Sequence, residues 1–364
     1  MISKRGRIDK VLLAAVILIA LLGIAFVYSA TCIRSDGGGN LDPLVMKQIL
    51  WVGIGFCFLF VFMNVDYVRI INSAYAAYAI NLGFLVILLL VGGERYGARR
   101  WIALGPVSLQ PSEFVKITVI LALAAFLRDR QDKRGSLGNY MGAAFLIAPA
   151  AGLIFLQPDL GTALVLVPIL FSILYICSER LKYMIVNICA AIVSMPFLWG
   201  ILKDYQKNRL MVFLNPSLDP LGAGYTIIQS KIAVGSGGIF GKGWLNGTQS
   251  YLKFLPERHT DFIFSVIGEE WGFAGAVILI SLYALIVWRG LRIIHKTNDI
   301  SAKAIAAGIV TLIAFQVLVN ISMTIGLMPV VGLPLPAISY GGSNTVATLI
   351  CAGLLLGVGR RAKS

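Results

Sequence analysis

The chain contains ten long apolar runs, and this pattern constrains its fold more than any other feature. A transmembrane helix needs about 20 predominantly apolar residues. The runs cover approximately residues 10–31, 46–65, 70–92, 112–127, 140–157, 160–178, 183–202, 261–288, 303–328 and 341–359. With 58% hydrophobic and 13% charged residues, the composition is that of an integral membrane protein. The sequence therefore predicts an all-α fold of about ten transmembrane helices, forming one polytopic domain over residues 1–364.

The distribution of Lys and Arg among the short loops predicts the orientation in the membrane. With the N-terminus in the cytoplasm, 18 basic residues fall on the cytoplasmic side and five in the short outer loops. Both termini are therefore expected to be cytoplasmic, and the first apolar run is expected to be retained as a helix and not cleaved as a signal peptide. The net charge of +14 is then a topology signal with some attraction to anionic lipid, and it does not indicate nucleic-acid binding.

This topology makes residues 203–260 one large outer loop between the seventh and eighth helices. Long loops often carry function. The loop includes the glycine-rich run GSGGIFGKG, which fails the Walker pattern because Ser236 and Gly243 stand at its two key positions. Its backbone amides and Lys242 could hold a phosphate group, or the run could be a flexible turn between two interfacial helices.

Four acidic residues stand in or near the first turns of predicted helices, where a functional and a structural explanation compete. Glu113 and Lys116 share one face of the fourth helix and can form an ion pair, which either faces a polar cavity or locks two helices together. Asp159, in the short connection QPDLGTA, is a natural helix N-cap. Glu269 and Glu270 lie two turns into the eighth helix, and a structural role is the better explanation for them.

The segment LPERHTDF gathers ionisable groups just before the eighth helix. Thr260 or Asp261 could simply cap that helix, but a cap does not require Glu257, Arg258 and His259 beside it. A partly desolvated carboxylate at a membrane boundary is well placed to act as a general base on a hydroxyl group. Asp261 is therefore the candidate catalytic residue.

Four segments give the chain a clear resemblance to a known family. They are GARRWIALGPVSLQPSEFVKI (97–117), QPDLGTA (157–163), YTIIQSKIAVGSGGIFGKGWLNGTQSYLKFLPERHTDFIFSVIGEEWGF (225–273) and GLMPVVGLPLPAISYGGSN (326–344). The chain resembles the SEDS family of shape, elongation, division and sporulation proteins, and its loop is closer to the elongation members than to the division members. Ser322, Ala337 and Asn344 depart from the usual family pattern near the last outer loop.

The resemblance implies a peptidoglycan glycosyltransferase that polymerises lipid II at the outer face of the bacterial cytoplasmic membrane. It places the family's aspartate on Asp261, the pocket ion pair on Glu113 and Lys116, and the arginine of the family's RW motif on Arg100. A sugar 4-hydroxyl needs a base to attack, and the inverted anomeric centre implies a single displacement. The departing undecaprenyl pyrophosphate needs cations, for which Arg100, Lys116, Lys242 and Arg209 are available. Glu257, His259 and Asp159 are the candidate supporting residues.

The resemblance also implies partners: a class B penicillin-binding protein that crosslinks the strands, and the membrane proteins of the elongation complex. No organic cofactor is expected. A divalent cation, Mg²⁺ or Mn²⁺, could be held by Asp159, Asp261 and the pyrophosphate oxygens, although no dense acidic cluster requires one. Five scattered cysteines support neither a disulfide framework nor a zinc site.

Two other functions would also suit a bundle of about ten helices. A lipid II flippase would need a central site at mid-membrane between internal repeats, whereas the charged motifs here cluster at the outer face and no convincing repeat is found. A scaffold that only anchors other proteins would not need these carboxylates.

Overall fold

The structure is a computed structural model, and it describes residues 6–31, 42–91, 100–104, 107–177, 204–219, 222–251 and 254–361, with single residues at 185 and 200. Its helices are α1 (Lys10–Thr31), α2 (Pro43–Asn64), α3 (Tyr67–Asn72), α4 (Ala74–Val91), α5 (Pro111–Asp129), α6 (Leu137–Leu156), α7 (Leu160–Ile176), α9 (Asp204–Leu214), α10 (Ala223–Ser236), α11 (Thr248–Tyr251), α12 (Ile263–Lys296), α13 (Ile300–Thr324) and α14 (Gly342–Arg361). Two single-turn 3₁₀ helices cover Gln131–Lys133 and Pro216–Leu218.

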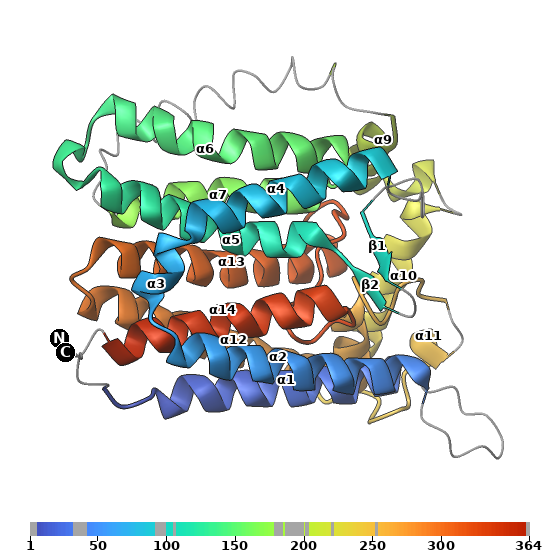
Figure 1. The fold of residues 1–364 in the computed structure, drawn as a ribbon. Helices are drawn as coiled ribbons and strands as arrows, with labels where there is room; N and C mark the ends of the chain where they lie inside the picture. Colours follow the sequence, from blue (N-terminus) through green and yellow to red (C-terminus); the bar gives the residue numbers. More distant parts are fainter. Residues whose placement is uncertain are drawn as a thin grey trace.

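The long helices lie side by side in one bundle, with α5, α13 and α14 in its middle (Figure 1). Six helices in the described part of the chain are long and apolar enough to cross a membrane: α1, α2, α6, α12, α13 and α14. In α14, 83% of the spanning window is buried, against 28% in α2, so α2 is one of the helices that present an apolar face outward. Apolar residues on such a surface are expected in lipid and would be a liability in water.

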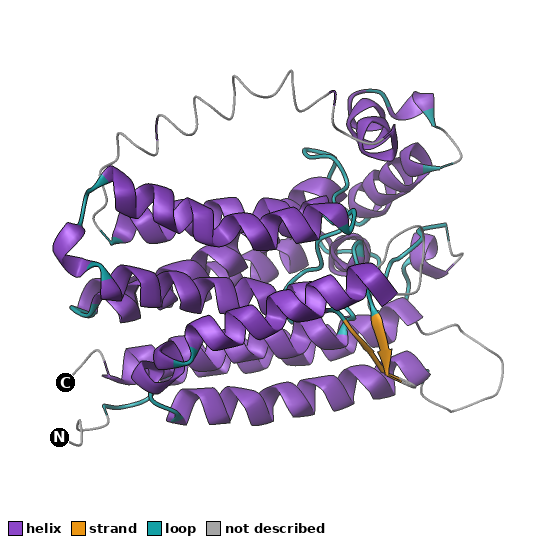
Figure 2. Cartoon of the chain, turned by 45° about the horizontal axis from the view of Figure 1, so that its top comes forward, coloured by secondary structure: helices purple, strands orange, loops and turns teal. Residues whose placement is uncertain are grey.

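Both chain ends lie at the same end of the bundle (Figures 1 and 2). The main-chain N–H of Gly6 donates to the carbonyl oxygen of Arg360 at 3.0 Å, which ties the two ends together. We call this the terminal end, and the opposite end, where α9, α10 and α11 lie, the site end. Two termini at one end are what a shared cytoplasmic location requires, and the cytoplasmic location itself stays a prediction.

The predicted helical membrane fold is confirmed, with local differences. The predicted third span is interrupted at Ser73, which separates α3 from α4. The predicted span over 183–202 lies outside the described residues, apart from 185 and 200. The all-α prediction missed a short hairpin, in which β1 (Ile102–Leu104) pairs antiparallel with β2 (Val107–Leu109) and Ile102 faces Leu109. The predicted loop over 203–260 contains the three helices α9, α10 and α11.

Helix α12 is broken near the site end, at Gly272, whose φ of 63° and ψ of −157° are not helical. The break leaves two carbonyl oxygens and two N–H groups without helical partners, and unpaired buried groups are costly. The turn after α10 supplies all four partners. Lys242 N and Gly243 N donate to the carbonyl oxygens of Glu269 and Glu270, at 3.0 Å each. Phe273 N and Ala274 N donate to the carbonyl oxygens of Gly238 and Ile239, at 2.9 Å each.

The glycines of this turn are needed because its backbone lies directly against α12. A Cβ atom on Gly241 would lie 2.1 Å from the carbonyl oxygen of Glu270, and one on Gly237 would lie 1.9 Å from that of Gly268. These distances are shorter than real Cβ atoms allow, so only glycine fits. The interpretation of GSGGIFGKG as a flexible turn is wrong: the segment is a fixed clamp on the break in α12.

Candidate active site

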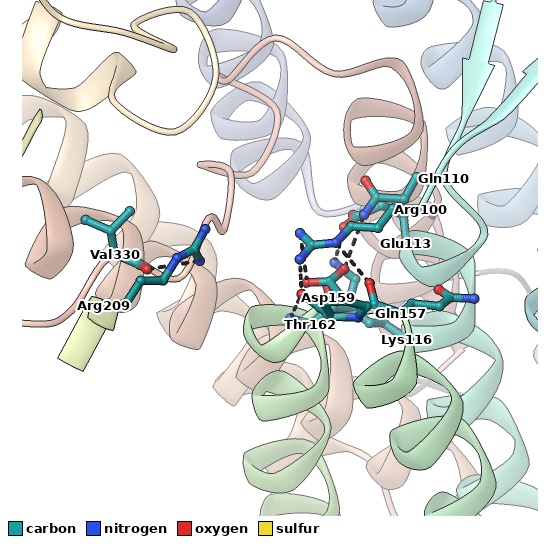
Figure 3. Close-up of polar contacts among 10 residues, drawn as sticks. Arg100, Gln110, Glu113, Lys116, Gln157, Asp159, Thr162, Arg209 and Val330 are labelled. Atoms are coloured by element: carbon teal, nitrogen blue, oxygen red, sulfur yellow. Dashed lines mark hydrogen bonds and ion pairs between the residues drawn. The ribbon is translucent and has the colours of Figure 1, made fainter. Parts of the chain in front are cut away.

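Arg100 and Asp159 form an ion pair at the site end of the bundle (Figure 3). Arg100 Nη1 lies 3.7 Å from Asp159 Oδ1, and the arginine also donates to the main-chain oxygens of Gln157, at 3.3 Å from Nε, and Pro158. Arg100 stands two residues before the first strand of the β-hairpin, and Asp159 directly precedes α7. The pair therefore joins the hairpin to the α6–α7 turn, and Arg100 stays partly exposed beside a buried carboxylate.

Asp159 also caps α7, as the capping interpretation predicted. Its side chain accepts from Thr162 N at 3.3 Å and from Thr162 Oγ1 at 2.9 Å. Gln110 Nε2 approaches the other side of the carboxylate, at 3.4 Å from Oδ2. The main-chain N–H of Gln110 in turn donates to Ser343 Oγ at 2.9 Å, which connects the start of α5 to the start of α14.

Glu113 and Lys116 form the predicted ion pair, with Lys116 Nζ 2.7 Å from Glu113 Oε1. The pair is almost completely buried, at 3% and 1% exposure. Figure 3 shows both residues beside Asp159, and the pair borders a cavity of only about 10 Å³, which is lined also by Gln316, Thr348 and Cys351. The pair lies within α5 and faces residues of α13 and α14 across this cavity, and its predicted role in holding substrate stays a prediction.

The turn that carries Asp261 is held by the irregular segment between α13 and α14. Asn320 Nδ2 donates to the main-chain oxygen of Asp261 at 2.9 Å and to that of Leu333 at 2.7 Å. Ser339 Oγ donates to the carbonyl oxygen of Thr260 at 2.6 Å, and Tyr340 N donates to that of His259 at 2.8 Å. The stretch from 326 to 341 contains no helix.

Asp261 is not the cap of α12. The residue at the N-cap position is Phe262, and no side chain makes a capping hydrogen bond there. The capping alternative for Thr260 and Asp261 is therefore wrong, and helix capping does not explain the Asp261 carboxylate. Beside it, Gly332 has a φ of +72°, and a Cβ at that position would lie 3.4 Å from Asp261 Oδ2. The backbone of the irregular segment thus approaches the carboxylate without a side chain between them.

Burial raises the pKa of Asp261 to about 6. Glu257 and, more weakly, Asp159 raise the pKa further, while Arg209 and Arg100 lower it. These four groups therefore lie within electrostatic range of Asp261. A carboxyl group with a pKa near 6 is ionised at neutral pH and is a stronger base than an ordinary aspartate, which is the property a general base needs.

Arg209 reaches the site from α9, inside the long predicted loop. Its Nη1 donates to the carbonyl oxygen of Val330 at 3.2 Å, as drawn at the left of Figure 3. Because Val330 and Gly332 belong to the same irregular segment, this contact joins α9 to the segment that borders Asp261. Arg209 and Arg100 thus lie near Asp261 although they belong to different parts of the chain. The prediction that both arginines serve the departing pyrophosphate requires this proximity.

Glu257 and His259 lie in the turn that ends at Asp261. Glu257 is exposed, with a φ of +48°, and its Oε2 accepts from Thr260 Oγ1 at 3.2 Å. The His259 ring packs edge to face against Tyr340 at a centroid distance of 5.6 Å. Burial lowers the pKa of His259, so the ring is neutral at neutral pH. Both residues shape the turn, and their predicted roles toward substrate stay predictions.

Lys242 belongs to a separate cluster at the break in α12. Its Nζ lies 2.7 Å from Glu269 Oε1, a carboxylate that also accepts from Thr248 Oγ1 at 2.9 Å and from Gln249 N at 3.1 Å. The neighbouring Glu270 accepts from Ser29 Oγ, in the last turn of α1. The structural interpretation of both glutamates is confirmed, although their place beside the last turn of α1 puts them near the site end and not deep in a span. The amides of Lys242 and Gly243 donate to α12 and that of Gly241 donates to Gly237 O, so these three are not available to cradle a phosphate.

Sequence reasoning missed Gln110, Gln157 and Asn320, which orient the charged groups. Gln110 contacts the Asp159 carboxylate, and the main-chain oxygen of Gln157 accepts from Arg100. Gln157 is itself held in place because its Nε2 donates to Leu85 O at 3.0 Å. Both glutamines therefore anchor the Arg100–Asp159 pair. A signal was available, because each glutamine precedes a proline in the related motifs QPSE and QPDL. Asn320 gave no such signal within an apolar helix. Among the described residues, no group of three or more His, Cys, Asp or Glu side chains is arranged to hold a metal ion.

These observations define a multi-pass membrane protein with a charged site at one end of a helical bundle. The sequence profile of the family described as "Cell cycle protein", which covers FtsW, RodA and SpoVE, matches residues 9–364. The peptidoglycan glycosyltransferase MrdB of Escherichia coli (strain K12) is 40% identical over 364 residues, which cover 98% of this chain and 96% of MrdB. The probable peptidoglycan glycosyltransferase FtsW of Trichlorobacter lovleyi is 37% identical over 356 residues, which cover 96% of this chain and 92% of that protein.

A solved structure agrees with this match. One chain in a solved structure of a peptidoglycan synthase complex, described as the structural coordination of polymerization and crosslinking, superposes on this chain with a TM-score of 0.82. The two chains are 36% identical, and the match covers 98% of each. The protein belongs to the SEDS family of FtsW, RodA and SpoVE proteins.

Proposed function

We propose that this protein polymerises lipid II into β-1,4-linked glycan strands during cell elongation, with Asp261 as the general base. The chain is a peptidoglycan glycosyltransferase of the SEDS family. The observation that carries the assignment of the base is the state of Asp261: a partly exposed carboxylate with a pKa of about 6, fixed through its backbone and not used as a helix cap.

The proposed chemistry is a single displacement at the anomeric carbon of the donor. Asp261 takes the proton from the acceptor's 4-hydroxyl as the oxygen attacks, and the bond to the pyrophosphate breaks on the opposite face, which inverts the α-linkage to a β-linkage. The leaving undecaprenyl pyrophosphate needs positive charge nearby. Arg100 and Arg209 are the cations within electrostatic range of Asp261 and are proposed for this role, with Lys116 and Lys242 as more distant contributors.

A divalent cation, Mg²⁺ or Mn²⁺, is proposed as a further source of positive charge. Asp261 and Asp159 are two hard carboxylate donors in one electrostatic neighbourhood, and pyrophosphate oxygens would supply the rest of the ligands. Asp159 is already engaged by Arg100 and Thr162, so the ion would rest mainly on the substrate. Polymerisation by protein treated with a chelator, and its recovery on adding Mg²⁺ or Mn²⁺, tests this proposal.

The proposed location is the bacterial cytoplasmic membrane, with both termini in the cytoplasm and the site end outside. The excess of Lys and Arg in the loops at the terminal end supports this orientation. The elongation role is supported by the form of the loop GKGWLNGTQSYLKFLPERHTDFIF. A class B penicillin-binding protein is the proposed crosslinking partner, within a complex of elongation membrane proteins, and the structural match to a chain of a peptidoglycan synthase complex supports it.

The test is polymerisation of lipid II by purified protein in detergent, followed as glycan products on a gel. Wild-type protein makes polymer, and Asp261→Ala abolishes polymer while the protein is still expressed and folded. The matched control is Asp132→Asn, which neutralises an exposed carboxylate at the terminal end and leaves the rate unchanged. Normal polymerisation by Asp261→Ala would rule out the general-base assignment.

The flippase alternative is tested in vesicles that contain labelled lipid II. Wild-type protein that moves lipid II between leaflets, and makes no polymer with or without its partner, would favour transport. The site residues described above gather at one end of the bundle, whereas alternating access requires a site near mid-membrane. Polymer formation without transport is therefore the expected result.

A further inference from the structure

A second polar cavity lies at the terminal end of the bundle, far from Asp261. It has a volume of about 770 Å³, and three parts of the chain line it: the segment that leads into α1, the last turns of α12 and the end of α14. The lining residues are Gly6, Arg7, Ile8, Asp9, Lys10, Val11, Arg289, Arg292, Ile293, Lys296, Gly359 and Arg360. Nothing in the proposed glycosyl transfer uses this cavity.

The charge of the lining is strongly positive, with six basic side chains and one acidic one. The acidic residue, Asp9, is already neutralised, because Arg289 Nε donates to its Oδ2 at 2.8 Å. In the described part of the chain, no acidic side chain pairs with Arg7, Lys10 or Lys296. A group of unpaired cations around one cavity repels itself, and an anion in the cavity would relieve that repulsion.

Helix ends alone explain only part of this arrangement. Basic residues in the last turn of a helix offset the negative end of its dipole, and Lys296 and Arg360 stand at such positions. Arg7 and Lys10 stand instead at the start of α1, where the dipole has the opposite sign and cations are unfavourable. The one carboxylate there, Asp9, accepts from Leu12 N and is paired with Arg289, so Arg7 and Lys10 leave an excess of positive charge beside the cavity.

The cavity is placed at the edge of the apolar surface. Lys10 is the first residue of α1, a span with a mean hydropathy of 3.0, and the cavity-lining Val11 is 46% exposed. On α12, Trp288 is 46% exposed and Leu291 is 41% exposed, and Arg292 stacks on the Trp288 ring at 3.7 Å. Exposed aromatic and aliphatic side chains beside basic ones are typical of the depth where lipid headgroups begin.

We propose that this cavity binds the phosphodiester headgroup of an anionic phospholipid, whose acyl chains lie along the apolar surfaces of α1 and α12. The phosphate is held by Lys10, Lys296 and Arg292, while Asp9 and Arg289 orient the start of α1. A lipid bound here clamps the two ends of the chain to α12. Soluble phosphate offers the same charge without the acyl chains, so the experiment must separate the two sources.

The test measures lipid retention by the full-length protein in detergent, using native mass spectrometry. Phosphatidylglycerol and phosphatidylcholine with the same acyl chains are added separately. The wild-type protein retains phosphatidylglycerol in preference to phosphatidylcholine, and Lys10→Gln/Lys296→Gln weakens the retention roughly 10- to 30-fold. The matched control, Arg69→Gln/Arg134→Gln, removes two exposed charges from the same end outside the cavity and changes retention less than about threefold.

Three results would overturn the proposal: equal retention of the two lipids by wild type, equal losses in the two double variants, or displacement of phosphatidylglycerol by millimolar inorganic phosphate. The last result would assign the cavity to a soluble anion. Unfolding temperatures without lipid check that the variants fold. If the double variant does not fold, the single variant Lys296→Gln, at an exposed position, must still lower retention about fivefold.

Discussion

The side-chain amide of Asn320 donates to the main-chain oxygen of Asp261 at 2.9 Å, and this bond fixes the proposed base from the middle of the bundle. Asn320 is fully buried in α13, and its second N–H donates to Leu333 O at 2.7 Å. One side chain therefore sets the distance between the Asp261 turn and the irregular segment that approaches the carboxylate. Asn320 is a positioning residue, since it touches the backbone and not the reacting carboxylate.

Replacing Asn320 by Ala is expected to lower the polymerisation rate about 10- to 100-fold, because a small displacement of a base is costly to catalysis. The loss of two buried hydrogen bonds costs about 2 kcal/mol of stability. The control is Asn139→Ala, which removes another buried asparagine, whose Nδ2 donates to Arg130 O at 3.4 Å near the terminal end. Both variants are less stable than the wild type, but under conditions where both are fully folded only Asn320→Ala has a lower polymerisation rate. Equal rates in the two folded variants would show that Asn320 is merely structural.

The pKa of Asp261 predicts the pH dependence of polymerisation. Since the carboxylate must be ionised to accept a proton, the rate should rise with pH and reach half its plateau near pH 6. Arg209 lowers this pKa, so Arg209→Gln should move the midpoint to a higher pH. The midpoint of the rate-against-pH curve is the measurement. It separates this effect from any loss of pyrophosphate binding, which changes the plateau.

The control for this prediction is Lys207→Gln, which removes a charge two residues away on the same helix, α9. Its midpoint should equal that of the wild type, because Lys207 is not among the groups that set the pKa of Asp261. A midpoint that moves equally in both variants would point to a general charge effect at the membrane surface.

The raised pKa also predicts that Asp261 costs stability. A carboxyl group whose folded pKa, about 6, exceeds its ordinary value of 3.8 opposes folding when ionised. The cost is fully present above pH 6 and disappears as the pH falls below about 4. Asp261→Asn should therefore stabilise the protein at pH 7.5, by on the order of 2 kcal/mol after allowing for partial solvation, and should not do so at pH 4.

Thermal unfolding of the purified protein at the two pH values measures this difference. Asp132→Asn, at an exposed site, is expected to change the unfolding temperature at neither pH. If Asp261→Asn is less stable than the wild type at pH 7.5, favourable contacts stabilise the ionised carboxylate, and the conclusion that burial raises the pKa of Asp261 is wrong.

The spans could be predicted from the sequence because a bilayer imposes one simple requirement, a run of apolar residues of fixed length. For the same reason, the Glu113–Lys116 pair and the Asp159 cap were predictable, since both depend on spacing within a few residues. The resemblance to the SEDS family added what spacing does not contain, namely the expectation that Arg100 and Asp261 serve one site. In the structure, Arg100 lies close enough to Asp261 to lower its pKa.

The features that sequence reasoning missed depend on contacts between distant segments. Asn320 and Asp261 are 59 residues apart, and no local pattern connects them. The break at Gly272 was hidden because the residues after it continue as an apolar run, and its hydrogen-bond partners lie in another part of the chain. From composition, the glycine-rich turn could equally hold phosphate or be a flexible turn, whereas in the structure the amides of Lys242 and Gly243 donate to carbonyl oxygens of α12.

The clamp on α12 yields the last prediction, for Gly241. This residue has a φ of +79°, and a Cβ would lie 2.1 Å from Glu270 O, so Gly241→Ala should destabilise the protein by about 2–4 kcal/mol. Gly235→Ala is the control: Gly235 lies inside α10 with nothing within 4 Å of the added atom, and the change should stabilise by about 0.5 kcal/mol. Thermal unfolding measures both. Because the clamp holds the segment of α12 that follows directly on Asp261, Gly241→Ala should also lower the polymerisation rate at temperatures where it remains folded, while Gly235→Ala should not. Equal stability of the two variants would mean that the turn can move away from α12 at no cost, and that the break at Gly272 does not depend on it.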